Sequence, residues 1–137
     1  MATDSLINFR NYSEQGYPLQ KESYQIIGIC MEVHRILGKG LLEIVYKDAI
    51  EYECKQNAHS YEREKMYSVS YKDVILPHKY FADFVVFDKI ILEVKSCEKI
   101  VNEHVGQVLN YLAASELKVG LIVNFGKKSL EYKRVVL

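Results

Sequence analysis

Residues Phe81–Lys95 read FADFVVFDKIILEVK and form two apolar runs joined by a short polar link. Three ionisable residues interrupt these runs, namely Asp83, Glu93 and Lys95. Charges are depleted from strands that face a core, because removing an unpaired charge from water is costly. Two interpretations follow. Either these side chains point to solvent, or they meet at a site that uses their charge, such as a divalent metal held by the two carboxylates.

The register of the predicted hairpin decides between these interpretations. Glu93 and Lys95 are two residues apart on one strand, so their side chains share a face. With a two-residue turn, Asp83 would pair with Val94 and would therefore point to the opposite face from Glu93. A three-residue loop, or a bulge near Asp83, would bring all three charged residues onto one face. A metal site therefore predicts an irregular hairpin.

Two carboxylates and an ammonium suit the hydrolysis of a phosphodiester. Mg²⁺ prefers oxygen ligands and keeps several waters, so two carboxylates can hold it, with Mn²⁺ as a substitute. The metal lowers the pKa of a bound water and neutralises charge on the phosphate. A nearby ammonium can stabilise that charge, orient the water or help to remove its proton. Zinc is disfavoured because no His and Cys ligands occur in a suitable cluster.

The composition fits one soluble globular domain. The chain has 137 residues, of which 49% are hydrophobic and 26% charged, and this length is enough for a core. The formal net charge is zero, so there is no global basic signal for nucleic acid. Three widely spaced cysteines without a Cys-x-x-Cys pair, no signal-peptide pattern and no long apolar segment predict a cytoplasmic protein without a membrane span.

The order of apolar patterns predicts the fold class. Residues 1–20 are expected to be a polar N-terminal arm and residues 21–137 a single domain. Pro77 is expected to mark the start of the second strand. The order helix, helix, three strands, helix, strand, strand indicates a mixed sheet flanked by helices, between α/β and α+β. Helical spacing covers about 23–37, 41–56 and 102–115, and strands are predicted at 65–71, 80–87, 90–95 and 119–125, with 130–137 as a last strand or a tail.

Two further predictions concern side chains on the first two helices. His34 lies beside the apolar stripe of the first helix, and it is expected to be a packed, hydrogen-bonded residue rather than a ligand. The second helix is expected to face the core through a stripe that starts at Leu42. The predicted members of that stripe are Leu42, Val45, Ala49 and Tyr52.

Motifs along the chain carry a family resemblance. The Asp83…Glu93-x-Lys95 core resembles the PD-(D/E)XK nuclease superfamily, with Ala82 in the place of the usual proline. The segment GLLEIVY, residues 40–46, resembles the G-x-x-E-x-x-Y signature of the small GxxExxY proteins, a branch of that superfamily. The segments VHRILGKG, EVKS, QVLNYL and LIVNFG are also similar to that family in order and spacing, so the resemblance covers about residues 22–136.

The resemblance implies a restriction-endonuclease-like αβββαβ core and a Mg²⁺-dependent nuclease. Asp83 and Glu93 would match the metal-binding acids and Lys95 the catalytic lysine. Glu43 would match an additional acid on an early helix. DNA is the expected substrate and RNA the alternative.

The resemblance also assigns the substrate side. Gln107 and Tyr111 would match a Q-x-x-x-Y pattern that lies by the active site and near the nucleic acid. Tyr46 shares a helix surface with Glu43 and is expected on the same side. His34 and His104 receive no role.

Two other functional hypotheses stay open. The chain could be a catalytically silent nuclease-fold module that binds nucleic acid or a protein partner. Alternatively, the acids could be unrelated surface residues, which predicts that they lie far apart or fully exposed. Exposed apolar strand residues could also build a homodimer.

Overall fold

The computed structural model describes residues 17–137, which form helices and strands in the predicted order. This order, with strands of both orientations in one sheet, confirms the predicted mixed α+β class. The helices are α1 (Gln20–Leu37), α2 (Glu43–Gln56) and α3 (Asn102–Ser115). The strands are β1 (Tyr61–Tyr71), β2 (Val74–Val86), β3 (Ile90–Lys95), β4 (Val119–Asn124) and β5 (Glu131–Val136).

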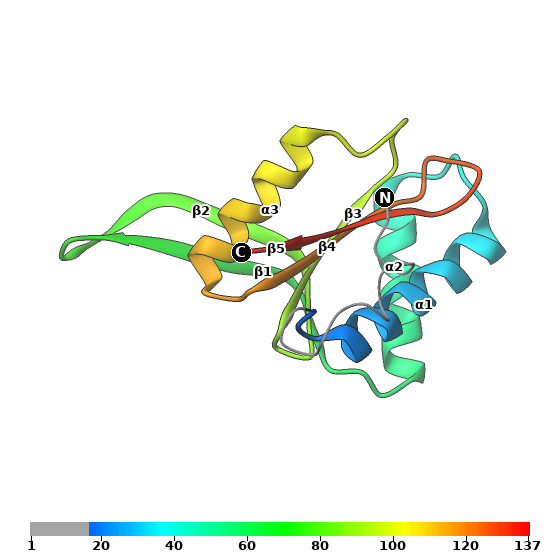
Figure 1. The fold of residues 1–137 in the computed structure, drawn as a ribbon, viewed down its shortest axis with the longest axis horizontal. Coiled ribbons are helices and arrows are strands. Elements are labelled where there is room, and N and C mark those ends of the chain that lie inside the picture. The colour runs from blue at the N-terminus through cyan, green and yellow to red at the C-terminus, as the bar shows by residue number, and fades with distance from the viewer. Residues whose placement is uncertain (1–16) are drawn as a thin grey trace.

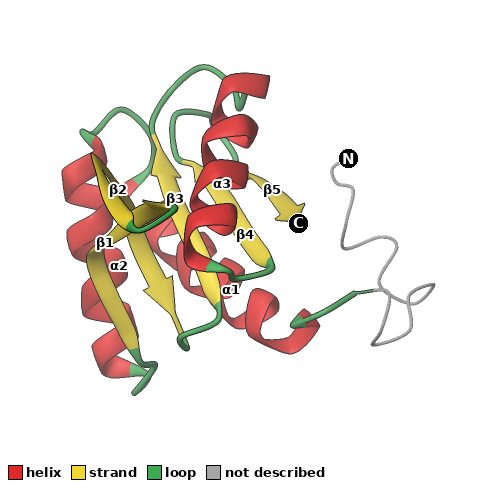
Figure 2. Cartoon of the chain, turned by 90° about the vertical axis from the view of Figure 1, so that its left-hand side faces the viewer, coloured by secondary structure: helices red, strands yellow, loops and turns green. Residues whose placement is uncertain are grey.

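The five strands form one sheet in the order β1-β2-β3-β4-β5. β3 and β4 are parallel, and the other neighbouring pairs are antiparallel. α3 makes the crossover between the two parallel strands, and these strands are almost entirely buried because helices cover both faces of the sheet (Figure 2). β5 pairs with β4 along its whole length, which settles the last segment as a strand rather than a tail.

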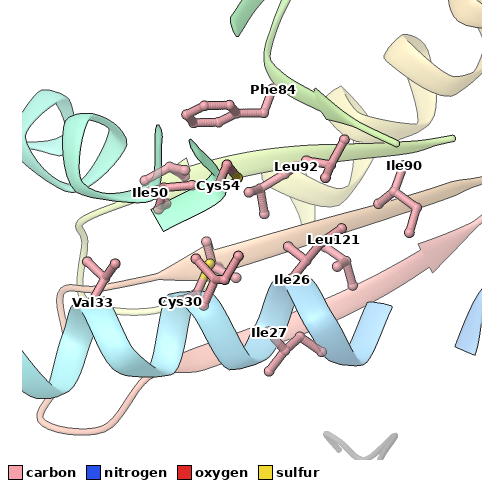
Figure 3. Close-up of a cluster of buried hydrophobic side chains, with 14 of the residues drawn as sticks. Ile26, Ile27, Cys30, Val33, Ile50, Cys54, Phe84, Ile90, Leu92 and Leu121 are labelled. Carbon is pink, nitrogen blue, oxygen red and sulfur yellow. The ribbon is translucent and has the colours of Figure 1, made fainter. Parts of the chain in front are cut away.

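α1 and α2 cover one face of the sheet. Ile26, Cys30 and Val33 of α1 pack with Ile50 and Cys54 of α2 against the strands, as Figure 3 shows. The buried cysteines behave as small hydrophobic side chains, as the sequence predicts, and both are free thiols. The strand residues labelled in this cluster are Phe84, Ile90, Leu92 and Leu121.

The predicted core face of α2 is wrong by about one residue. The buried residues are Tyr46, Ile50 and Cys54, at spacings of four. Leu42 and Tyr52 are exposed by 74% and 60%. Apolar residues occur almost all round this helix, so its sequence does not fix which stripe faces the sheet, and contact with α1 decides it.

α3 covers the opposite face. Val108 and Leu112 of this helix pack on Ile91 and Ile122 of the central strands. The helix lies so close to the sheet that a Cβ at Gly120 would stand 2.5 Å from Val108 Cγ1. A glycine at that strand position therefore permits the close approach.

Two boundaries differ from the predictions. The end of the expected arm belongs to the fold, because Tyr17 is buried and Arg134 Cζ lies 3.8 Å from the centre of its ring; residues 1–16 lie outside the described residues. β2 begins before Pro77, not after it. The proline is tolerated because the register shifts between Ser68 and Ser70, which places it in a bulge.

The long β1–β2 ribbon extends beyond the helices at the end away from α1 and α2 (Figure 1). Among the described residues, no helix is long and apolar enough to cross a membrane.

Candidate functional site

The β2–β3 hairpin has the irregular geometry on which the site depends. Phe84 pairs with Leu92 and Val86 with Ile90, so the loop is the three-residue segment 87–89. Its first residue, Phe87, has a left-handed backbone with φ of 59°. This register places Asp83 opposite Glu93 and confirms the prediction of an irregular hairpin.

Asp83 and Glu93 replace the backbone pairing at the next rung of the hairpin. Asp83 N–H donates to Glu93 Oε2 at 2.7 Å, and Val94 N–H donates to Asp83 Oδ2 at 2.8 Å. Each carboxylate is therefore fixed by one oxygen, while Asp83 Oδ1 and Glu93 Oε1 are left for other partners. The alternative in which these two acids lie far apart on exposed faces is wrong.

The two carboxylates are adjacent and shielded from solvent. Glu93 is only 3% exposed, and the Asp83 side chain is 15% exposed. Burial, followed by the charge of Asp83, raises the pKa of Glu93 to about 8. A divalent cation bound between the carboxylates would offset the cost of burying their charges and the repulsion between them. Because Mg²⁺ and Mn²⁺ prefer oxygen ligands of this kind, the pair fits either ion.

Lys95 lies at the end of β3 and is oriented by α3. Its Nζ donates to Gln107 Oε1 at 3.4 Å. Tyr111, one turn further along the helix, is 6% exposed. Burial, followed by the charges of Glu93 and Asp83, raises the pKa of Tyr111 to about 12. The structure thus brings both predicted α3 residues to the carboxylate pair and its lysine.

An open groove borders this part of α3. Its volume is about 830 Å³. Gln107, Asn110 and Tyr111 of α3 line one side, and residues 78–81 of β2 line the other. Tyr80 of this wall contacts Tyr111 edge to face, with ring centres 5.6 Å apart. A substrate in the groove would therefore contact Gln107, which bonds to Lys95, and Tyr111, whose pKa the charges of the two acids help to raise.

Glu43 lies near the site but does not join the carboxylate pair. It is exposed in the first turn of α2, and its Oε2 accepts from Ser96 N–H at 3.2 Å. In residues 17–137, no three His, Cys, Asp or Glu side chains are grouped closely enough to hold a metal. Glu43 therefore contacts the backbone just after Lys95 rather than the space between Asp83 and Glu93.

Tyr46 is a core residue, which corrects its predicted place on the substrate side. The side chain is fully buried, and its ring stacks on Phe125 with centres 4.4 Å apart. Its hydroxyl donates to Gly38 O at 2.6 Å and accepts from Leu41 N–H at 3.2 Å. Tyr46 therefore fixes the α1–α2 loop and has no surface that a substrate can reach.

His34 and His104, to which the sequence gives no role, both have structural partners. His34 is 8% exposed, and its Nε2 donates to Lys127 O at 2.8 Å. This confirms the prediction of a packed, hydrogen-bonded residue. His104 Nδ1 accepts from Val101 N–H at 3.1 Å, which satisfies a backbone donor at the start of α3.

Sequence reasoning missed two charged residues that contact the site. Lys47 Nζ lies 3.0 Å from Asp83 Oδ1 and 3.0 Å from Glu64 Oε2. Burial opposes the charge of Lys47, but its hydrogen bonds to Glu64 and Asp83 outweigh burial and raise its pKa. Lys47 is four residues after Glu43 on the same helix, a spacing that could have drawn attention to it. Glu64 has no comparable signal.

The loop after Lys95 is held by a buried amide. Asn124 Oδ1 accepts from Cys97 N–H and Gly126 N–H, both at 3.0 Å. Its Nδ2 donates to Cys97 O and Glu131 Oε1, also at 3.0 Å. Lys95 is the register partner of Asn124, so this network fixes the backbone on which the lysine stands.

The fold and the site together define a class of protein: an α+β domain that carries a carboxylate pair and a lysine on two adjacent strands inside a mixed sheet. The family model of the PD-(D/E)XK nuclease superfamily matches residues 20–135. The chain therefore belongs to the PD-(D/E)XK nuclease superfamily.

The solved structures agree with this fold. The crystal structure of SSO0001 superposes with a TM-score of 0.55 at 18% sequence identity and covers 67% of this chain. The chain spans about half of that protein, 48% of its length. A comparison with curated proteins found no significant match.

Proposed function

We propose that the protein is a Mg²⁺-dependent nuclease that hydrolyses phosphodiester bonds, with DNA as the expected substrate, and that it belongs to the GxxExxY branch of its superfamily. One observation carries the proposal: Glu93 is 3% exposed and bonds to the backbone of a second acid, Asp83, at 2.7 Å. Two ionised acids buried side by side have a high energetic cost unless a bound cation compensates their charge. Lys95 follows two residues after Glu93 on the same strand.

The residues divide the work of the proposed reaction. Asp83 Oδ1 and a carboxylate oxygen of Glu93 would hold the metal. The bound ion supplies an acidified water and neutralises charge on the phosphate. Lys95 would orient the attacking water and stabilise the charge that builds on the phosphate. Gln107 would keep the lysine side chain directed toward the reacting group.

The groove beside α3 would receive the nucleic acid. Gln107 and Tyr111 line it, and Gln107 bonds to Lys95, so these two residues would position the scissile phosphate. Glu43 would act as an outer acid, because its carboxylate holds the backbone of Ser96 beside Lys95. Glu43 would therefore lie outside the set of groups that bind the metal directly.

A cleavage assay tests the proposed function. Purified protein is incubated with single- and double-stranded DNA and with RNA, in Mg²⁺, in Mn²⁺ and in EDTA. We expect metal-dependent cleavage, and Lys95→Ala should lower its rate by at least about 100-fold because a group that acts on the reacting atoms is lost. Lys55→Ala removes an exposed lysine in the last turn of α2, at the opposite end of that helix from Glu43, and should leave the rate unchanged.

Two results would contradict the proposal. One is the absence of cleavage of every substrate by folded protein in either metal. The other is a cleavage rate that Lys95→Ala does not change, which would mark a contaminating nuclease. Metal-dependent binding of nucleic acid without cleavage would favour the silent binding module instead.

A further inference from the structure

Lys47 bonds to Oδ1 of Asp83, the carboxylate oxygen that the proposed metal would need. Its Nζ is 3.0 Å from Asp83 Oδ1, while the second oxygen of Asp83 is used by Val94 N–H. An ammonium and a divalent cation cannot both bind Oδ1 at close range, because they repel each other. Any metal that takes Asp83 Oδ1 must therefore displace Lys47.

Glu64 offers the displaced ammonium a second partner. Its Oε2 is already 3.0 Å from Lys47 Nζ. The Glu64 side chain is 52% exposed, whereas those of Lys47 and Asp83 are 13% and 15% exposed. Lys47 can therefore move outward along its flexible stem and keep one ion pair while it gives up the other.

The backbone around Glu64 places its carboxylate at this position. Glu64 has a left-handed φ of 54° inside β1. Its neighbours pair normally, Arg63 with Phe84 and Lys65 with Ala82, so Glu64 stands at the same rung as Asp83. A non-glycine residue in this conformation is uncommon in a strand and is often found where a side chain is re-aimed near a site.

Lys95 makes no such contact. Its Nζ bonds to Gln107 of α3, whereas Lys47 belongs to α2, and these two helices cover opposite faces of the sheet. The two ammoniums therefore differ in their partners: Lys47 bonds to a carboxylate of the pair, and Lys95 bonds to a neutral amide.

We propose that Lys47 is the built-in counter-ion of the metal site. In the metal-free protein it bonds to both Asp83 and Glu64, and when a divalent cation binds it releases Asp83 and keeps only its ion pair with Glu64. This inference rests on the proposed metal site. Lys47 is a positioning residue in this account. It sets the metal affinity and the charge of the empty site, and it does not touch the reacting atoms.

The test measures the Mn²⁺ dissociation constant by calorimetric titration of the full chain without nucleic acid. Lys47→Met should bind Mn²⁺ about tenfold more tightly than wild type, because the competing ammonium is gone. Lys95→Met is the matched control: it removes a nearby positive charge that does not touch the carboxylates, so it should tighten binding much less. Far-UV circular dichroism confirms that each variant is folded.

Glu64→Gln tests the exchange itself. In wild type it should weaken Mn²⁺ binding by about threefold or more, because the displaced Lys47 loses its second partner. In the Lys47→Met background the same change should have little effect. A simple long-range loss of negative charge would instead weaken binding equally in both backgrounds.

The outcomes separate this inference from the proposed function. Mn²⁺ binding that Lys47→Met leaves unchanged or weakens would overturn the counter-ion role while the metal site stands. Equal tightening by Lys47→Met and Lys95→Met would also overturn it, since general electrostatics would then suffice. Failure of every folded variant to bind Mn²⁺ would remove the metal site and the counter-ion role together.

Discussion

At the scale of single residues, Asp83 and Glu93 do two tasks at once. Each accepts a hydrogen bond from the backbone of the facing strand, and each keeps one oxygen for a further partner. The backbone contacts hold the carboxylates at a fixed separation without a metal. The carboxylates are therefore pre-organised for a cation, and the repulsion between them is the cost that a cation would remove.

The raised pKa of Glu93 predicts how the metal-free protein responds to pH. An acid whose pKa is raised in the folded state binds a proton more strongly when folded, so stability is full below the unfolded pKa near 4.5 and falls as pH rises through about 8. Glu93→Gln mimics the protonated acid and should remove this dependence. Between pH 5 and pH 9, in EDTA, the free energy of unfolding of wild type should fall relative to Glu93→Gln by on the order of a few kcal/mol.

Urea unfolding at a series of pH values measures this difference. Asp88→Asn, in the exposed hairpin loop, is the control and should follow wild type at every pH. If the free energies of unfolding of wild type and Glu93→Gln changed in parallel with pH, Glu93 would be ionised in both the folded and the unfolded chain. That result would contradict a raised pKa of Glu93.

Sequence reasoning reached the acids and their register but not all of their neighbours. The alternation rule for strands limits the hairpin to a few registers, so the three-residue loop could be predicted from the chemistry of Asp83 and Glu93. Lys47 and Glu64 could not be assigned in the same way, because their contact depends on how α2 rotates over β1. Tyr46 was misplaced for the same reason.

At the scale of elements, the β1–β2 ribbon exchanges faces at the site. Phe84 packs in the core under α1 and α2, whereas Ala82 packs in the core under α3. Residues two apart in a regular strand share a face, so the ribbon must twist sharply at Asp83. The left-handed residue Glu64 lies at the same rung of β1. This twist places Asp83 at the boundary between the core under α1 and α2 and the core under α3.

The loop from β3 to α3 is the second element that shapes the site. Asn124→Ala would leave the partly buried N–H and C=O of Cys97 without their partner. We expect this change to lower the free energy of unfolding by about 2–4 kcal/mol, since each lost partner leaves a desolvated polar group. The metal affinity should change little, because Asp83 and Glu93 are held by other contacts.

Denaturant unfolding and Mn²⁺ titration check the two parts of this prediction. Asn110→Ala on the exposed side of α3 makes the same substitution without the buried network and should change stability by less than about 0.5 kcal/mol. A loss of stability no larger than that of the control would contradict a structural role for Asn124.

The bounds of the helices and strands could be predicted with different accuracy. α3 has the predicted bounds because its apolar stripe is narrow and regular, and β3 has them because its apolar run is bounded by polar residues. β1 begins at Tyr61 rather than at residue 65, because its first residues pair with residues 84–86 of β2. β2 begins at Val74 rather than at residue 80, because residues 74–79 form an exposed ribbon with no buried face to mark them in the sequence. Pairing between the two strands, not burial, sustains that part.

At the scale of the whole molecule, the site lies between the two helical layers, on two adjacent strands inside the sheet. The cores on the two faces are separate, and the charged rung of Asp83 and Glu93 lies where β2 and β3 diverge between them. The order of elements and the family followed from the sequence, because each pattern is local. The meeting of α2, β1 and α3 around the acids depends on packing between distant segments, so it required the structure.

The central claim is that Asp83 and Glu93 hold a divalent metal, and a crystal structure of the protein grown with Mn²⁺ tests it most directly. We expect an anomalous peak about 2.0–2.3 Å from Asp83 Oδ1 and from a carboxylate oxygen of Glu93. Well-ordered carboxylates with no anomalous peak between them, at Mn²⁺ concentrations that support metal binding in other nucleases of the superfamily, would contradict the claim.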